Sequence, residues 1–374
     1  MGRPTLKYIR MYAKAWSSLV LWLSWSLGAY ASPGPPPGTE DIPQMMAASV
    51  LVCKGEVIEA PTPKFSQSRA GASDLTARVR PDRCFKGSPS GFSIPILFDG
   101  SVSGVDPSFV LHKGDYRLFF LKPQNGVYAV VDRWFGALPV SRRLGFSPAG
   151  SDEMYALELD LKAGLRDESK ELVLDSIQML GDMKHVRSTS ELTALLDHSE
   201  LLIKTYVWQA LLRLKDYSVL PAVSEFFESR PEVPRELILP RDCLLEIKAE
   251  LIAEVSAIRG PETLPFLEKV AVTGKGSILR MNALQALRAI HSPHSAQAFL
   301  KELSDPNPDN GFIAMQGLLS LAGPGRTEWV PTWKQFDEAP AFYGIKCREW
   351  WRTEGELRML SNYAAQPFSL PEGR

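Results

Sequence analysis

A recurring helix end and turn in the second half of the chain constrains the fold more than any other feature. From residue 151 to about residue 365 the apolar residues follow a helical period. The same helix end returns at spacings of 34, 44, 32 and 31 residues, anchored on Leu180, Leu214, Ile258, Ile290 and Leu321. A period of this size with two helices per unit predicts an α-solenoid, in which each unit buries its apolar stripe against the next. A bundle of long helices is the alternative.

The turns after these helix ends also repeat. They contain Gly260-Pro261, Ser292-Pro293 and Gly323-Pro324, and the longest interval contains a polar insertion at residues 230–235. With the A-L-x-x-[LI] helix ends and the short helix that follows each turn, residues 165–325 resemble short HEAT-type repeats of the variety known from phycobilisome lyases. This resemblance implies a HEAT-like solenoid and concerns the architecture only.

The first half of the chain has the period of β-strands. Apolar or alternating segments at residues 47–60, 73–87, 92–98, 114–121 and 127–135 are separated by turn-rich connections. Asn125-Gly126 between the last two segments predicts a β-hairpin. Five short strands without a helix predict a closed or partly open barrel of the oligonucleotide/oligosaccharide-binding (OB) type over residues 47–148. The chain is therefore expected to be a multidomain α+β protein.

Three strand-region motifs resemble netrin-like or metalloproteinase-inhibitor-like barrels. ASVLVCKGEVIEA, CFKG and LHKGDYRLFFL occur in the order found in bacterial members of that group. In the inhibitors, a processed N-terminal cysteine chelates the zinc of the target through its amine and carbonyl. Here the expected mature chain begins at Ser32 and Cys53 lies well inside it. The resemblance therefore does not carry the zinc-chelating mechanism over to this chain.

The N-terminus has the pattern of a secretory signal peptide. Residues 1–14 contain Arg3, Lys7, Arg10 and Lys14 and no acid, and residues 15–27 are uncharged and mostly apolar. An A-x-A site predicts cleavage after Ala31, so residues 1–31 are expected to direct export by the general secretory route to the periplasm, cell surface or exterior. An uncleaved signal, the only expected membrane contact, is the alternative. Residues 32–46, rich in Pro and Gly at their start, are expected to be a linker.

The chain has four cysteines, and an exported protein can oxidise them in pairs. Cys53 and Cys84 lie in neighbouring strand segments, so a disulfide between them is a candidate, with free thiols as the alternative. Cys243 and Cys347 occupy apolar positions of helical segments and are expected to be buried thiols. No C-x-x-C spacing occurs, which gives no support to a thioredoxin-like pair or a zinc knuckle.

Motifs that carry chemistry are missing from the sequence. It contains no H-E-x-x-H, G-x-S-x-G or S-x-x-K, and a net charge of -1 argues against a nucleic-acid partner. Residues 305–311 resemble the start of a calcium loop, but the twelfth position of that loop is Gln316 instead of the usual Glu. We therefore expect a turn in which Asp309 or Asn310 caps the next helix. We therefore expect no catalytic residue, no cofactor and no bound metal.

Aromatic residues are the remaining candidates for recognition. Trp134 and Phe135 close the strand region, and Trp351 lies near the C-terminus, so these three are candidate interaction residues. The other aromatic residues near the C-terminus are expected to cap the last repeat of the solenoid, and they are Trp329, Trp333, Phe336, Phe342 and Trp350.

These features predict an exported, non-enzymatic binding or scaffold protein. Its helical-repeat surface would hold a protein partner or another extended ligand, an expectation based on architecture. An enzyme, or an enzyme-accessory subunit, with a site assembled from scattered residues is one alternative. A secreted protease inhibitor that acts through the β-barrel is another.

Overall fold

A computed structural model of the chain describes residues 41–61, 74–99, 111–132, 136–148, 150–228, 241–258, 260–274, 277–324 and 327–365. The chain divides into two compact units, Met1–Glu40 and Asp41–Arg374, and all described residues belong to the second. The expected signal peptide and most of the expected linker therefore lie outside the described residues, as do Trp134 and Phe135.

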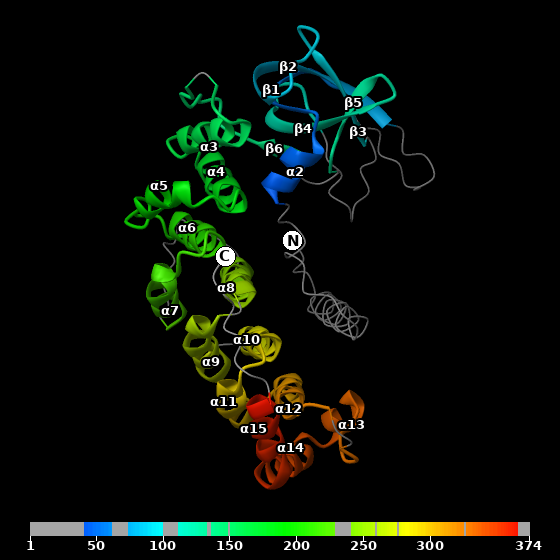
Figure 1. Cartoon of the computed structure of the whole chain (residues 1–374), viewed down its shortest axis with the longest axis vertical. Coiled ribbons are helices and arrows are strands. Elements are labelled where there is room, and N and C mark those ends of the chain that lie inside the picture. Colours follow the sequence, from blue (N-terminus) through cyan, green and yellow to red (C-terminus); the bar gives the residue numbers. More distant parts are fainter. Residues whose placement is uncertain are drawn as a thin grey trace, which may run out of the picture. The chain divides into compact units, whose positions relative to one another are not determined.

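The described part has a two-part α+β architecture, in which one short helix and six strands lie before residue 140 and the other helices lie after residue 152 (Figure 1). Five strands close into a barrel in the order β1-β2-β3-β5-β4, because β4 pairs back onto β1. The β3–β5 pairing is parallel and the other pairings are antiparallel. A sixth strand adds to β4. The strands are β1 (Leu51–Glu59), β2 (Asp74–Lys86), β3 (Ile94–Asp99), β4 (Tyr116–Gln124), β5 (Val127–Val130) and β6 (Ala137–Pro139).

Both faces of β1 are buried, which explains its nearly continuous apolar sequence. Leu51, Cys53 and Val57 belong to the core inside the barrel. Val52 belongs to a second core that extends through the helices. The first strand therefore joins the barrel to the helical part.

The hairpin expected at Asn125-Gly126 is confirmed. The two residues have φ values of 51° and 81°, which are the positive values that a two-residue type I′ turn requires. They connect β4 to β5, with Gln124 opposite Val127.

A short helix, α2 (Ile42–Ala48), lies where the sequence predicted the end of the linker, and that part of the prediction was wrong. Its buried residues are Ile42, Met45 and Met46, which follow the spacing of one helical face. They pack into the core shared with the helices, so the folded unit begins before the first strand.

The helical part consists of long helices alternating with short ones. The connections that follow α4, α6, α8 and α10 each contain one turn of 3₁₀ helix, such as Tyr217–Val219 and Pro293–Ser295. The helices are α3 (Glu153–Gly164), α4 (Lys170–Asp182), α5 (Thr189–Thr193), α6 (Leu201–Arg213), α7 (Leu220–Glu228), α8 (Arg241–Ile258), α9 (Leu264–Thr273), α10 (Ser277–Ile290), α11 (Ala296–Glu302), α12 (Pro308–Ala322), α13 (Trp333–Glu338), α14 (Pro340–Trp350) and α15 (Glu356–Ala365), with a π-helical turn at Trp351–Gly355.

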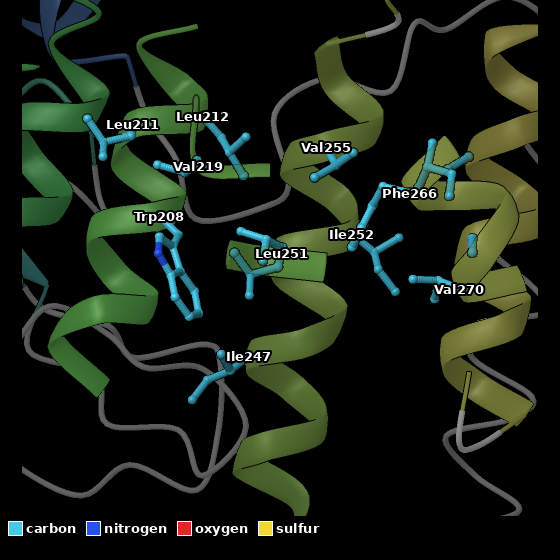
Figure 2. Packing of buried hydrophobic residues seen from close by; sticks show 14 of the residues in the cluster. Trp208, Leu211, Leu212, Val219, Ile247, Leu251, Ile252, Val255, Phe266 and Val270 are labelled. Atoms are coloured by element: carbon cyan, nitrogen blue, oxygen red, sulfur yellow. The ribbon is translucent and has the colours of Figure 1, made fainter. Parts of the chain in front are cut away.

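Each long helix packs against the next long helix along the chain. The contacts run from α4 to α6, from α6 to α8, from α8 to α10 and from α10 to α12, while α9 contacts α7 and α11. Figure 2 shows one step of this arrangement, in which α8 presents Leu251 beside Trp208 and presents Ile252 near Phe266 and Val270. The five anchors of the sequence period lie in the last turn, or at the C-cap, of the five long helices.

The turns after four of the long helices share one backbone feature. A residue with a positive φ follows α4, α6, α10 and α12, at Lys184, Lys215, His291 and Gly323, and the ψ of −177° places Gly323 outside the left-handed helical region. Such a residue ends a helix by allowing the backbone to hydrogen-bond back onto the last turn. The repeat that the sequence shows in its apolar residues is therefore also present in the local backbone.

Aromatic residues cover α12 at the C-terminal end. Phe336 is fully buried, and its ring centroid lies 5.5 Å from that of Phe312, which also contacts Trp333 at 5.4 Å. Trp351 is only 4% exposed. Its choice as a surface interaction residue was therefore wrong, because its ring packs with Trp350 in the core.

Candidate functional site

The two cysteines of the strand region are joined. Cys53 on β1 lies opposite Cys84 on β2 in the strand register, and a disulfide connects them. Cys347 is a buried free thiol, and burial raises its pKa to about 12. Cys53 itself is fully buried inside the barrel, where its sulfur is bonded to that of Cys84.

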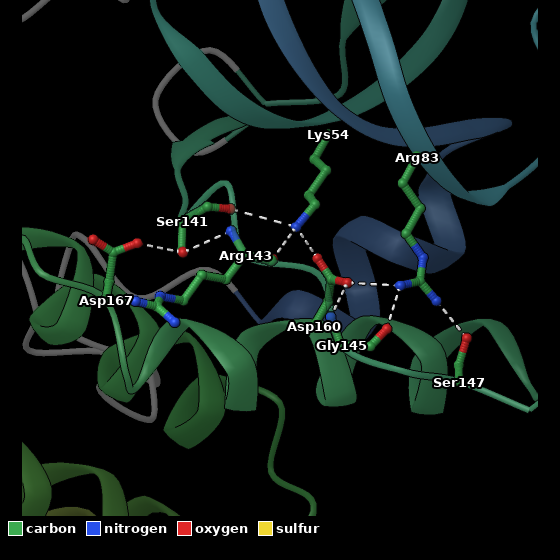
Figure 3. A network of polar contacts seen from close by, with 8 residues as sticks. All are labelled: Lys54, Arg83, Ser141, Arg143, Gly145, Ser147, Asp160 and Asp167. Carbon is green, nitrogen blue, oxygen red and sulfur yellow. Dashed lines mark hydrogen bonds and ion pairs between the residues drawn. The ribbon is translucent and has the colours of Figure 1, made fainter.

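A buried network of charges lies where the barrel meets α3 (Figure 3). Asp160 on α3 pairs with Lys54 on β1 through one carboxylate oxygen and with Arg83 on β2 through the other, the second contact at 2.8 Å. The side chains of Lys54 and Asp160 are each 3% exposed. Buried charges are tolerated when they are paired and hydrogen-bonded, as these are.

The segment between β6 and α3 supplies the remaining partners of this network. Lys54 Nζ donates to the carbonyl oxygens of Ser141 at 3.4 Å and Arg143 at 2.6 Å. Arg83 donates to the carbonyl oxygen of Gly145 at 2.5 Å and to the hydroxyl of Ser147. Alternate residues of the segment thus face the network, which is the geometry of an extended chain.

Asp160 also fixes the backbone of this segment directly. The Gly145 N–H donates to Asp160 Oδ1 at 2.9 Å. A β-carbon on Gly145 would lie 2.1 Å from the carbonyl oxygen of Leu159. Glycine is required here because the segment lies directly on the backbone of α3.

The network offers no room for a small-molecule substrate. Burial lowers the pKa of Lys54, and the hydrogen bond and charge of Asp160 oppose that effect. The void beside Lys54 has a volume of about 10 Å³, which accommodates roughly one water molecule. Its walls are mostly apolar, including Phe85, Leu118 and Leu157. The amine is thus a structural cation that binds one carboxylate and two carbonyl groups.

A second polar network connects three successive long helices. Arg213 on α6 pairs with Asp182 on α4 at 2.8 Å and with Glu254 on α8 at 2.7 Å. Gln209 on α6 donates to Glu250 on α8 at 2.9 Å. Burial raises the pKa of Asp182 to about 6, and the charge of Arg213 opposes this rise. These mostly buried polar contacts therefore connect α4, α6 and α8.

Sequence reasoning found neither network. The partners are 77 residues apart for Arg83 and Asp160, and 31 and 41 residues apart for Arg213 and its two acids. Helical spacing rules connect only residues three or four positions apart, so these pairs leave no local signal.

The turn predicted at residues 305–311 covers only residues 305–307, because α12 begins at Pro308, and its cap also differs from the prediction. Asn307 caps α12 by accepting a hydrogen bond from the Asp309 N–H at 3.1 Å, so the choice of Asp309 or Asn310 was wrong. Asn310 is fully buried and donates to Asp305 at 3.2 Å. The carboxylate of Asp305 is engaged by Arg280 at 2.7 Å.

Within the described residues, no group of three or more His, Cys, Asp or Glu side chains is arranged to bind a metal ion. None of the helices described above combines the length and apolarity that a membrane crossing needs.

Comparison with known proteins adds no relative. No protein-family model matches the sequence, and a search of curated proteins finds no match.

Proposed function

We propose that this protein is an exported, non-enzymatic binding protein that holds a protein partner against its row of long helices. The observation that carries the proposal is the packing of each long helix against the next one along the chain. In a HEAT-like solenoid this arrangement produces an extended surface, and such surfaces serve binding.

The architecture that supports this function combines a HEAT-like solenoid with an OB-type, netrin-like barrel. For the solenoid, the supporting observations are the residue of positive φ and the 3₁₀ turn that recur between long and short helices. For the barrel, support comes from its five-stranded closure and its small, side-chain-filled interior. Fold alone does not determine a partner, and the class of partner depends on the chemistry of the surface.

The polar network on α4, α6 and α8 supports a protein partner. Its side chains are mostly buried, with exposed fractions of 15% for Arg213 and 10% for Glu254, and they already pair with one another. A partner would meet only the exposed edges of these paired charges instead of a strong field of one sign. The near-neutral net charge of -1 favours the same class of partner over a polyanion.

An enzyme, or an enzyme-accessory subunit, remains the alternative. Turnover in a panel of hydrolase substrates, lost on substitution of one acid or histidine, would favour it.

Site-specific photo-cross-linking tests the proposed surface. Ala257 on α8 and Ala289 on α10 are exposed positions on long helices, and Ala222 on α7 is an exposed alanine on a short helix. We place a photoreactive residue at Ala257 or at Ala289 in the full chain, in its native compartment. We expect both positions to cross-link to the same partner protein, giving adducts of the same mass. Excess protein without the photoreactive residue should compete for the partner and reduce the adduct.

The control position and the export signal complete the test. Substitution at Ala222 should give no such adduct, and equal labelling at all three positions would contradict the proposal.

The exported protein should begin at Ser32, as measured by intact mass. A protein that keeps residues 1–31 would contradict the proposed cleavage.

A further inference from the structure

The segment that lies on the buried network exposes two large apolar side chains. Leu144 is 60% exposed and Phe146 is 87% exposed. The residues between and beside them, Arg143, Gly145 and Ser147, are the ones that bind Lys54, Arg83 and Asp160 (Figure 3). One side of the segment is thus fixed to the protein and the other faces solvent.

The backbone N–H and C=O groups of the segment also alternate between the fixed side and the free side. The structure has no turn or bend from residue 143 to residue 148. In an extended chain, the N–H and C=O groups of successive residues point to opposite edges. Within the described part of the chain, Leu144 and Phe146 make no hydrogen bond. Their backbone groups form a free edge beside their exposed side chains.

We propose that residues 143–148 form a binding strand for a serine endoprotease with an apolar primary pocket, and that Phe146 enters this pocket. Such a protease binds the chain in front of it as an extended strand, and it takes the side chain before the scissile bond into a specificity pocket. Phe146 would occupy that position and Leu144 would lie two residues upstream, so the free backbone edge is the one presented to the enzyme.

The fixed side of the segment supports an inhibitor over a substrate. The bond that would be attacked joins Phe146 to Ser147. Arg83 binds on both sides of this bond, at the Gly145 carbonyl and at the Ser147 hydroxyl. The strand is therefore held in place before an enzyme binds, which lowers the entropic cost of association. The same contacts keep the segment after the bond from leaving the enzyme.

This surface is separate from the long-helix surface proposed above, and it assigns a second kind of partner to a different part of the chain. It also differs from zinc chelation by an N-terminal cysteine, because neither Cys53 nor a metal takes part.

Inhibition of three serine proteases by the purified full chain tests the proposal. We expect the protein to inhibit chymotrypsin, whose primary pocket is apolar, and to have little effect on trypsin or elastase. Phe146→Ala should weaken inhibition of chymotrypsin by about 100-fold, the loss typical of an anchor residue. Phe146→Arg should transfer inhibition to trypsin, an effect that a structural defect cannot produce.

The matched control is Phe92, which is 78% exposed elsewhere on the barrel. Phe92→Ala should leave inhibition unchanged. No inhibition of chymotrypsin at micromolar protein would overturn the proposal, and so would an equal loss in the Phe92 and Phe146 variants.

A second variant tests the role of the fixed side. Arg83→Met removes the contacts on both sides of the bond while keeping Phe146. We expect chymotrypsin to cut this variant after Phe146, as detected by mass spectrometry, while the wild type stays intact. Cleavage of the wild type after Phe146 at the same rate would show a simple substrate and would contradict the proposal.

Discussion

Arg83 on β2 donates a hydrogen bond to Asp160 on α3 across 2.8 Å, and the same carboxylate also pairs with Lys54 on β1. One buried acid therefore pairs with two cations from two strands of the barrel. It also accepts a hydrogen bond from the segment that precedes α3. This carboxylate therefore connects β1, β2 and the segment before α3 to α3 itself.

Asp160→Asn should destabilise the protein by about 3–5 kcal/mol, because it leaves two cations at a mostly buried site without a counter-charge. Urea unfolding measures the change. The control is Glu59→Gln, since Glu59 and Arg78 form an ion pair whose side chains are 72% and 59% exposed. That change should stay within about 0.5 kcal/mol. Equal losses would show that the network does not stabilise the junction.

Arg213→Met should destabilise the protein more at pH 8 than at pH 5. The variant leaves Asp182 and Glu254 without their shared cation, and protonation of Asp182 relieves the repulsion at low pH. The pKa of Asp182 is already raised to about 6 by burial. The loss should reach about 3 kcal/mol at pH 8, as for other broken buried pairs.

A second arginine on the long helices provides the control for this experiment. Arg288 on α10 has a neutral partner, Gln316. Thermal unfolding of Arg288→Met should show the same small loss at both pH values. A pH-independent loss in the Arg213 variant would contradict the expected coupling.

The titration of Glu302 should lower the free energy of unfolding as the pH rises from about 4.5 to about 7. Burial raises its pKa from 4.5 to about 7, with the neighbouring Asp305 adding to the effect. In this range the folded state holds a proton that the unfolded state has released, so each rise in pH favours unfolding. Above about 7 the contribution is constant.

Glu302→Gln should remove this part of the slope. Chemical unfolding at several pH values measures it, and Glu262→Gln, at an exposed position, serves as the control. An unchanged slope in the Glu302 variant would contradict the assignment.

Reduction of the Cys53–Cys84 disulfide should cost about 4 kcal/mol, because the bond closes a loop across a sequence separation of 31 residues. Unfolding with and without dithiothreitol measures this loss, and intact mass shows the two added hydrogens. A double variant, Cys53→Ala with Cys84→Ala, should be insensitive to the reductant. If reductant changes neither the mass nor the unfolding midpoint of the wild type, the bond is absent.

The sequence predicted the local features of the fold well. The Asn125-Gly126 hairpin was predictable because only a few residue pairs accept two positive φ values. The helix ends were predictable because their apolar residues recur. Helix α2 was missed, since its seven residues follow a proline-rich stretch and carry one short apolar face.

The candidate sites could not be predicted in the same way. Asp160 has the sequence context of an ordinary helical residue, and its importance comes from Lys54 and Arg83, which only the folded barrel brings to it. Leu144 and Phe146 similarly have no motif around them. Their interest lies in the contrast between their exposure and the fixed backbone beside them.

Hydrogen exchange of the Phe336→Ala variant tests most directly whether the helical half is a row of nearest-neighbour units. Phe336 is fully buried beside Phe312 on α12, so its truncation should cost about 3–5 kcal/mol locally. In a row of stacked units, amide protection should fall in α11 and α12 and stay unchanged in α4 and α6. An equal loss of protection from α4 to α12 would show one cooperative globule and would contradict the proposed architecture.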